Sequence, residues 1–306
     1  MTERGAAPAG AEPGPAHRVS LGATRYGKAE TRVVRVDRSA ARHRIRDLNV
    51  SIALAGDVAE TYLTGDNASV LPTDSQKNAV YAFAQEHGIG EPEEFALRLA
   101  RYFVETQPAI NWARVSAEEY GWDRIELAGA PAPHSFARSG RETRLVSVTC
   151  TGARAWVVSG LSDLVLLNTT DSEFRGYPRD RYTTLPETGD RVLATAVTAR
   201  WRHADAAGDW AESYREVRRH LIEAFAGTYS RSLQQTLYAM AERVLAARPE
   251  LAEIRLTLPN RHHLLVDLAP FGLPNANETF VAADRPYGLI EGSISRDGAP
   301  EPGEAW

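Results

Sequence analysis

Apolar residues along the chain follow two spacings, alternation and a period near four, and the change between them marks the expected elements. In the segment 44–56, apolar side chains alternate with smaller or polar ones from Leu48 onward, as in a β-strand with one buried face. After Pro92, a residue suited to a first helical turn, Phe95 and Leu99 recur at helical spacing. The first half therefore predicts strands at 29–37 and 44–56, helices at 74–87 and from about 92, and strands at 109–127 and 143–151.

The second half repeats this order of strands and helices. Val217 and Leu221 lie four residues apart on one predicted helix, and Ile254 and Leu256 alternate with charged residues on a predicted strand. The expected elements are strands at 153–169 and 190–203, helices at 211–226 and 231–247, a strand around 253–258 and a last strand at 286–295.

This repeated order predicts an α+β protein with antiparallel sheets and helices on one face. We expect a leader at 1–20, a first domain at 21–140, a second domain at 141–296 and a flexible tail at 297–306. Long antiparallel strands leave exposed sheet edges, which proteins commonly cover by pairing with another chain. An oligomer closed into a barrel would satisfy both edges.

Composition narrows the functional class. The chain has 306 residues, 43% of them hydrophobic and 25% charged, with a net charge of −5 and interspersed signs. These values are typical of a globular protein and favour neither a nucleic-acid groove nor a membrane surface. Cys150 is the only cysteine, which excludes an intramolecular disulfide. No run approaches the ~20 apolar residues of a membrane span, and the last residues are not a Ser-Lys-Leu peroxisomal signal, so a cytoplasmic location is expected.

No sequence pattern of a cofactor site is present. The chain has no glycine-rich phosphate loop, no dinucleotide fingerprint and no Gly-x-Ser-x-Gly turn. The adjacent residues His262 and His263 would point to opposite faces of a strand, which makes them a poor metal clamp. We therefore expect an enzyme that uses neither a metal nor an organic cofactor.

The segment 73–78 carries more polar residues than a helix start requires. Thr73, Asp74 or Ser75 could each cap the predicted helix, and the remaining polar residues have no structural role there. The backbone N–H groups and the dipole at a helix start favour anionic or carbonyl-rich partners. The surplus predicts a ligand at this helix start.

Further polar segments have no evident structural role. A lysine at 28 opens the first strand, and a long loop at 174–191 is rich in aromatic residues and arginines, as functional loops often are. Gln234 stands at the start of the last predicted helix. Pro259 is expected to interrupt the strand that contains it, because proline cannot donate a ladder hydrogen bond.

Seven motifs, taken in order, resemble the urate oxidase (uricase) family, a cofactor-independent family of purine breakdown. They cover residues from about 20 to 295. They are Tyr-Gly-Lys at 26–28, Thr-Asp-Ser-x-Lys-Asn at 73–78, Pro-His-Ser-Phe at 133–136, Ser-x-Phe-x-Gly at 172–176, Arg-Asp-x-Tyr-Thr-Thr-Leu at 179–185, Asp-Arg at 190–191 and Leu-Pro-Asn-x-His at 258–262.

The resemblance implies a fold, an assembly and a reaction. The fold would be two tandem tunnelling-fold (T-fold) domains, and the assembly a homotetramer with sites between subunits. The reaction would convert urate, O2 and water into 5-hydroxyisourate and hydrogen peroxide.

The resemblance also implies how a flat purine anion is bound. Arg191 would form a two-pronged contact with the anionic edge, and the amide of Gln234 would donate to and accept from the opposite edge. Phe174 would stack on the ring, while Leu185 and Leu233 would wall the pocket. The alternatives are that Phe174 and Leu185 belong to an ordinary core and that Arg191 forms a surface ion pair.

A second group of residues would move protons. The hydroxyl of Thr73 could take a proton from urate if a neutral Lys28 accepts its own proton. His262 would extend this relay. Asn260 would hold O2 or the peroxide above the ring, and Asp74 would contact the purine through its backbone N–H.

Two other functions are compatible with the fold. One is a purine-binding protein without turnover, which would have no need for Lys28, Thr73 and His262 together. The other is a T-fold enzyme of pterin or GTP chemistry, which generally requires metal ligands that this sequence lacks.

Overall fold

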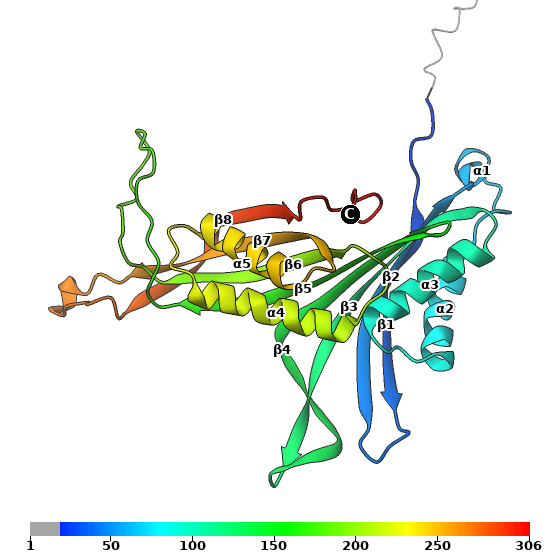
Figure 1. The fold of residues 1–306 in the computed structure, drawn as a ribbon, viewed down its shortest axis with the longest axis horizontal. Coiled ribbons are helices and arrows are strands. Elements are labelled where there is room, and N and C mark those ends of the chain that lie inside the picture. Colours follow the sequence, from blue (N-terminus) through cyan, green and yellow to red (C-terminus); the bar gives the residue numbers. More distant parts are fainter. Residues whose placement is uncertain (1–18) are drawn as a thin grey trace, which may run out of the picture.

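Eight strands pair side by side in the order in which they occur in the chain, and every neighbouring pair is antiparallel. The computed structural model describes residues 19–306 (Figure 1). The strands are β1 (Tyr26–Asp37), β2 (Arg44–Gly56), β3 (Ile110–Leu127), β4 (Ala130–Thr151), β5 (Arg154–Asn168), β6 (Leu193–His203), β7 (Leu251–Leu265) and β8 (Phe280–Ser295). Strands β1 and β8 form the two edges of the sheet.

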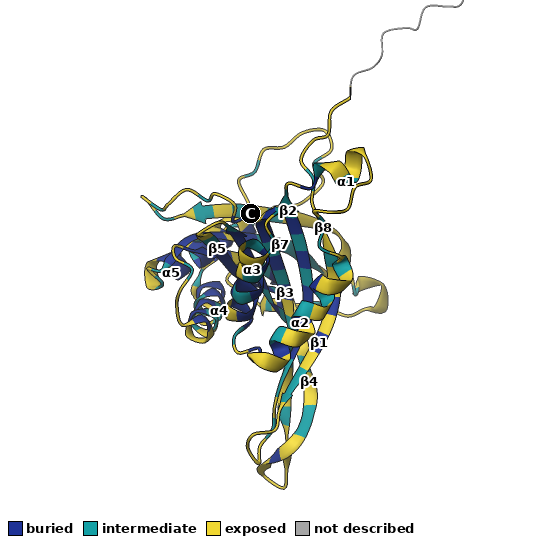
Figure 2. Ribbon diagram, turned by 90° about the vertical axis from the view of Figure 1, so that its right-hand side faces the viewer, coloured by how far each residue is buried: buried dark blue, intermediate teal, exposed yellow. Residues whose placement is uncertain are grey.

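Four long helices cover one face of this sheet (Figures 1 and 2). Helices α2 and α3 pack on the early strands, and α4 and α5 pack on the later ones. This arrangement confirms the predicted α+β class with antiparallel strands and helices on one face. The helices are α1 (Ala59–Leu63), α2 (Thr73–Glu86), α3 (Pro92–Thr106), α4 (Trp210–Gly227) and α5 (Leu233–Ala247), with a short 3-10 turn η1 (Ala269–Phe271). None of these helices is long and apolar enough to cross a membrane.

Two hydrophobic cores lie between the sheet and its helices. Leu48 and Phe103 belong to the core under α2 and α3, whereas Trp201 and Met240 belong to the core under α4 and α5. The predicted domain boundary at 140/141 falls inside β4, which pairs with both β3 and β5, so the sheet continues across it. The division into two domains stays a prediction.

Two strands begin far earlier than their sequence patterns predict, by six residues or more. Strand β4 begins at Ala130 rather than 143, and β8 begins at Phe280 rather than 286. The additional part of β4 pairs with the end of β3 in a ribbon that projects from the sheet (Figure 1). Most residues of this ribbon are exposed or half-buried (Figure 2), so little hydrophobic alternation marks it in the sequence.

The last residues run across the face of the sheet that has no helices. Trp306 Nε1 donates to Glu253 Oε2 at 3.1 Å, and Arg202 donates to the Pro300 carbonyl at 2.8 Å. Arg114 donates to the Glu304 carbonyl at 2.6 Å. The segment 297–306, expected to be a flexible tail, therefore has defined contacts with β3, β6 and β7. The predicted leader lies almost entirely outside the described residues.

Candidate active site

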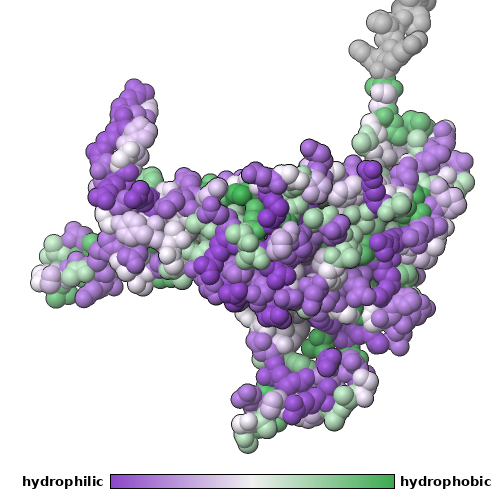
Figure 3. Space-filling model, viewed as in Figure 1, coloured by the Kyte–Doolittle hydropathy of each residue, from purple (hydrophilic) through white to green (hydrophobic). Residues whose placement is uncertain are grey.

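A cavity of about 370 Å³ lies between the loop that precedes β6 and the outer ends of β7 and β8. It has the size of a small-ligand pocket. The loop between β5 and β6 projects beyond the sheet (Figure 1), and its surface is largely hydrophilic (Figure 3). Five residues predicted from the sequence line this one cavity, namely Phe174, Leu185, Arg191, Asn260 and His262.

Arg191 is a half-buried cation in the cavity wall. Its backbone N–H donates to the Ser172 carbonyl at 2.9 Å, and its Nε donates to Ser172 Oγ at 3.2 Å. Burial lowers the pKa of Arg191, yet an arginine remains protonated at neutral pH. Within residues 19–306, no carboxylate lies within 4.0 Å of its guanidinium nitrogens. The alternative of a surface ion pair is therefore not seen, and an anionic ligand would complete the charge.

Phe174 lies beside Arg191 on a short bridge to Thr188. Its backbone N–H and carbonyl pair with those of Thr188 at 2.9 and 3.1 Å. The guanidinium carbon of Arg191 is 5.3 Å from the centre of the Phe174 ring. Tyr177 stacks on the same ring with centroids 4.9 Å apart. One aromatic face is thus already paired, and Leu185, which is 54% exposed, is not a core residue.

Asn260 and His262 stand two residues apart on β7, and both line the cavity. The expectation that Pro259 interrupts this strand is wrong, because β7 runs through it from Leu251 to Leu265. Pro259 lies opposite Leu289 of β8, and the pairing with β6 skips it. A proline can remain inside this strand because the ladder is broken on one side only.

Leu233 and Gln234 begin α5 and do not line the cavity. Leu233 is 2% exposed and packs in the second core, so its side chain contributes to that core rather than to the pocket wall. Gln234 is exposed at the helix start. Ser172 and Ser230 form a bridge that joins this helix start to the Arg191 loop.

Lys28, Thr73 and Asp74 lie at the other end of the molecule, on β1 and at the start of α2 (Figure 1). None of the three candidate caps, Thr73, Asp74 and Ser75, has that role, since Pro72 is the cap residue and makes no side-chain cap bond. The exposed Asp74 accepts from Lys77 instead, and this bond, followed by the charge of Lys77, lowers its pKa, with a smaller effect from the charge of Lys28. A single chain does not bring these residues to the cavity.

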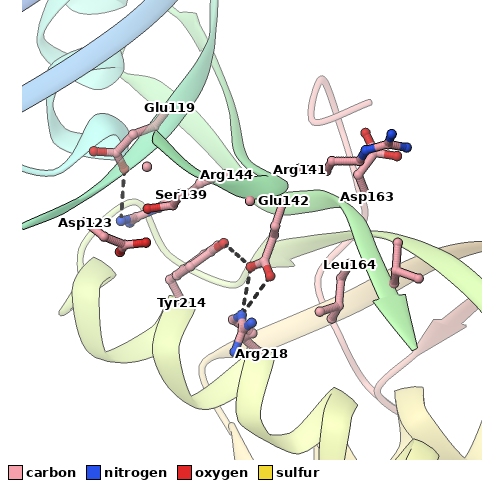
Figure 4. Close-up of a pocket in the computed structure, with 13 residues that line it drawn as sticks. Glu119, Asp123, Ser139, Arg141, Glu142, Arg144, Asp163, Leu164, Tyr214 and Arg218 are labelled. Atoms are coloured by element: carbon pink, nitrogen blue, oxygen red, sulfur yellow. Dashed lines mark hydrogen bonds and ion pairs between the residues drawn. The ribbon is translucent and has the colours of Figure 1, made fainter. Parts of the chain in front are cut away.

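A larger cavity, of about 680 Å³, lies where α4 crosses β4 and β5 (Figure 4). Glu142 accepts from the Tyr214 hydroxyl at 2.9 Å and from Arg218 Nε at 2.8 Å. Burial, followed by the charge of Glu142, raises the pKa of Tyr214. The residues come from distant parts of the chain and form no motif, so the sequence gives no sign of this cavity. Its central charges are already paired.

A buried polar network joins the two cores behind that cavity. Arg144 donates to Glu91 and to Glu93, each at 2.6 Å, and Ser159 Oγ donates to Glu93 at 2.7 Å. His203 Nε2 lies 2.9 Å from Ser159 Oγ. The serine proton is directed to the carboxylate, so the imidazole N–H is the donor to Ser159. Burial raises the pKa of Glu93 and lowers the pKa of His203 to about 4.

Within residues 19–306, no group of three or more histidines, cysteines or acidic residues is arranged to hold a metal ion. The residues predicted from the sequence thus form two separate groups at opposite ends of the chain's fold. One is a cavity with an unpaired arginine, an aromatic ring, an amide and an imidazole. The other is Lys28 on β1 together with Thr73 at the start of α2.

Comparison with known proteins points to one family. The family model described as Uricase matches residues 24–149 and 157–291. The chain is 48% identical to a uricase of Arthrobacter globiformis over 94% of both chains, and 39% identical to a uricase of Dictyostelium discoideum over 89% of this chain and 96% of that one. The crystal structure of the Arthrobacter globiformis uricase superposes with a TM-score of 0.89, covering 93% of this chain and 97% of that one.

Proposed function

This chain belongs to the uricase family, and from that premise we propose how its two groups of residues oxidise urate. The protein is a urate oxidase, an oxidoreductase of purine breakdown. The balanced reaction takes urate, O2 and water to 5-hydroxyisourate and hydrogen peroxide. Two electrons leave the purine for O2, and the oxygen of water remains on the purine.

The observation that carries this proposal is the unpaired Arg191 in a cavity shared with Phe174, Asn260 and His262. Urate is an anion near neutral pH, so its anionic edge supplies the charge that Arg191 lacks. Phe174 would offer a ring face to the purine, with Tyr177 supporting the opposite face of that ring. Asn260 would hold O2 and then peroxide above the bound urate.

Proton removal is assigned to Lys28 and Thr73, with His262 as the relay to solvent or peroxide. Removal of a second proton makes bound urate electron-rich enough to reduce O2. A threonine hydroxyl alone is a poor base and needs a neighbouring amine to take its proton. Asp74 would contribute its backbone N–H from the first turn of α2, where no side-chain cap occupies the helix start.

The two groups meet only if two chains share a site. Lys28 lies on the edge strand β1, while His262 lies on β7 and pairs with Ala283 of the opposite edge strand β8. A sheet that continues from one chain into the next would place β1 of one chain beside β8 of another. We therefore propose sites between subunits of a homotetramer, with no metal or organic cofactor.

Mixing inactive variants tests the shared site. Lys28→Met and Arg191→Ala each remove one group, so each oligomer alone should show almost no O2 uptake or peroxide release with urate. Co-refolded in equal amounts, they should regain roughly a quarter of wild-type activity, because one site in four receives both intact residues. An unrestored mixture would contradict the shared site.

Two further outcomes separate the alternatives. Urate binding by the wild-type protein without O2 uptake would support the purine-binding function instead. Turnover that disappears after chelation and returns with added metal would refute the proposed cofactor-free reaction. Wild-type protein stripped of metal is therefore assayed beside Lys28→Met.

A further inference from the structure

Strand β1 contains a β-bulge directly after Lys28, where Ala29 and Glu30 together stand opposite the single residue Ser51 of β2. Glu30 has a φ of 56°, in the left-handed region that side chains other than glycine adopt at a cost. Its backbone N–H donates to Ser51 Oγ at 3.0 Å. This side-chain acceptor gives the bulged N–H a partner and holds the irregular backbone in place.

The bulge decides which face of the sheet carries the lysine. Residues directly opposite in an antiparallel pair share a face. Lys28 lies opposite Ile52, and Val33 lies opposite Leu48, and both partners are buried in the core under α2 and α3. Five positions separate Lys28 from Val33, so in a regular strand the two would point to opposite faces. The extra residue turns both toward the helices.

The helix side is the side on which the start of α2 lies. Tyr26 shares this face with Lys28, because it lies opposite the buried Leu54. The Tyr26 hydroxyl accepts from the backbone N–H of Leu71 at 3.1 Å, two residues before Thr73. The bulge therefore orients two side chains. One is Tyr26, which is hydrogen-bonded to the segment before α2, and the other is Lys28, which is assigned to proton transfer.

We propose that Ser51 is a positioning residue for Lys28, acting through the bulge at Ala29 and Glu30. The inference rests on the proposed role of Lys28 in urate oxidation. Ser51 lies opposite Ser116, on the face without helices, so its side chain points away from that of Lys28. Its effect is on the direction of the lysine and not on the binding of urate.

The kinetic test uses two matched pairs of variants. Ser51→Ala removes the acceptor and is expected to lower kcat about tenfold with KM for urate unchanged, whereas Ser51→Thr keeps a hydroxyl and restores kcat. Deletion of Glu30 returns β1 to regular alternation and should lower kcat about a hundredfold or more. Glu30→Gly favours the left-handed backbone and should keep wild-type kcat. Unfolding midpoints in urea identify any variant that fails to fold.

A second readout does not depend on urate. In the Glu30 deletion, Tyr26 should turn away from Leu71, and hydrogen exchange at the Leu71 amide should become about tenfold faster or more, while Glu30→Gly retains its protection. Wild-type kcat in the deletion, or in Ser51→Ala, would overturn the inference, as would unchanged Leu71 exchange in a folded deletion variant. Absence of urate turnover by the wild-type protein would refute the proposed function alone, because Leu71 exchange would still report the bulge.

Discussion

Acidification is expected to destabilise the fold through His203. This imidazole is 6% exposed, is hydrogen-bonded to Ser159 and lies nearly perpendicular to the Trp210 ring, with centroids 4.9 Å apart. Burial holds its pKa at about 4, against 6.5 for an unperturbed histidine, with Glu250 opposing and Arg248 and Arg144 adding to the shift. The folded protein therefore keeps His203 neutral at pH values where the unfolded chain already binds a proton.

The sign and size of the effect follow from that difference. The contribution of neutral His203 to the free energy of unfolding is complete above about pH 6.5 and is lost as the pH falls from 6.5 toward 4. With these two pKa values, the loss from His203 alone is about 2 kcal/mol at pH 5 and about 3 kcal/mol at pH 4. A loss of this size is a large fraction of the free energy that stabilises an ordinary domain.

The matched variant is His203→Gln, whose neutral amide can still donate to Ser159. Urea unfolding is followed between pH 8 and pH 4.5 at one fixed protein concentration, because dissociation would otherwise change the midpoint. The difference in unfolding free energy between wild type and variant should shrink by about 2 kcal/mol between pH 8 and pH 5. Glu93 is present in both proteins, so the subtraction removes most of its contribution. Parallel pH curves for the two proteins would refute the reasoning.

Three further predictions concern single residues. Arg191→Lys loses the two-pronged contact with the urate anion, so KM for urate should rise about tenfold or more in steady-state assays, and an unchanged KM would remove Arg191 from the site. Cys150 is buried, and burial raises its pKa to about 11. A thiol-disulfide reagent at pH 8 should therefore label it only after denaturation, and rapid labelling of the folded protein would contradict its burial. In Gly27→Ala, the new Cβ would overlap the Ile52 carbonyl, so urea unfolding should show a loss of about 1–3 kcal/mol, and a wild-type midpoint would contradict that overlap.

Helices and strands could be predicted from the sequence wherever one face of the element is buried and the other is exposed. Strand β2 and helix α3 each turn one face to the first core, which imposes the alternation from Leu48 and the spacing of Phe95 and Leu99. The outer part of β4 lacks a core, so no periodicity marks it. The interruption predicted at Pro259 was wrong because the hydrogen-bond ladder with β6 skips this residue, so β7 can continue through it.

The candidate site could be predicted only where its residues form contiguous motifs. Arg191 and His262 lie in such motifs, and the structure places both on one cavity. Leu233 lies at the start of a correctly predicted helix, but local sequence does not say whether a helix residue faces a core or a pocket. Ser51 and His203 each form a single side-chain hydrogen bond to a residue distant in the sequence. No local spacing encodes such pairs.

The two edges of the sheet have a consequence for how activity depends on dilution. In the proposed assembly, Lys28 comes to each contact between chains from β1 of one chain. His262 comes from β7 of the other chain, next to the edge strand β8. The functional unit is then the contact between chains, and its abundance obeys mass action. At concentrations where subunits separate, each chain would keep its sheet and helices while turnover per chain falls in proportion to the remaining contacts.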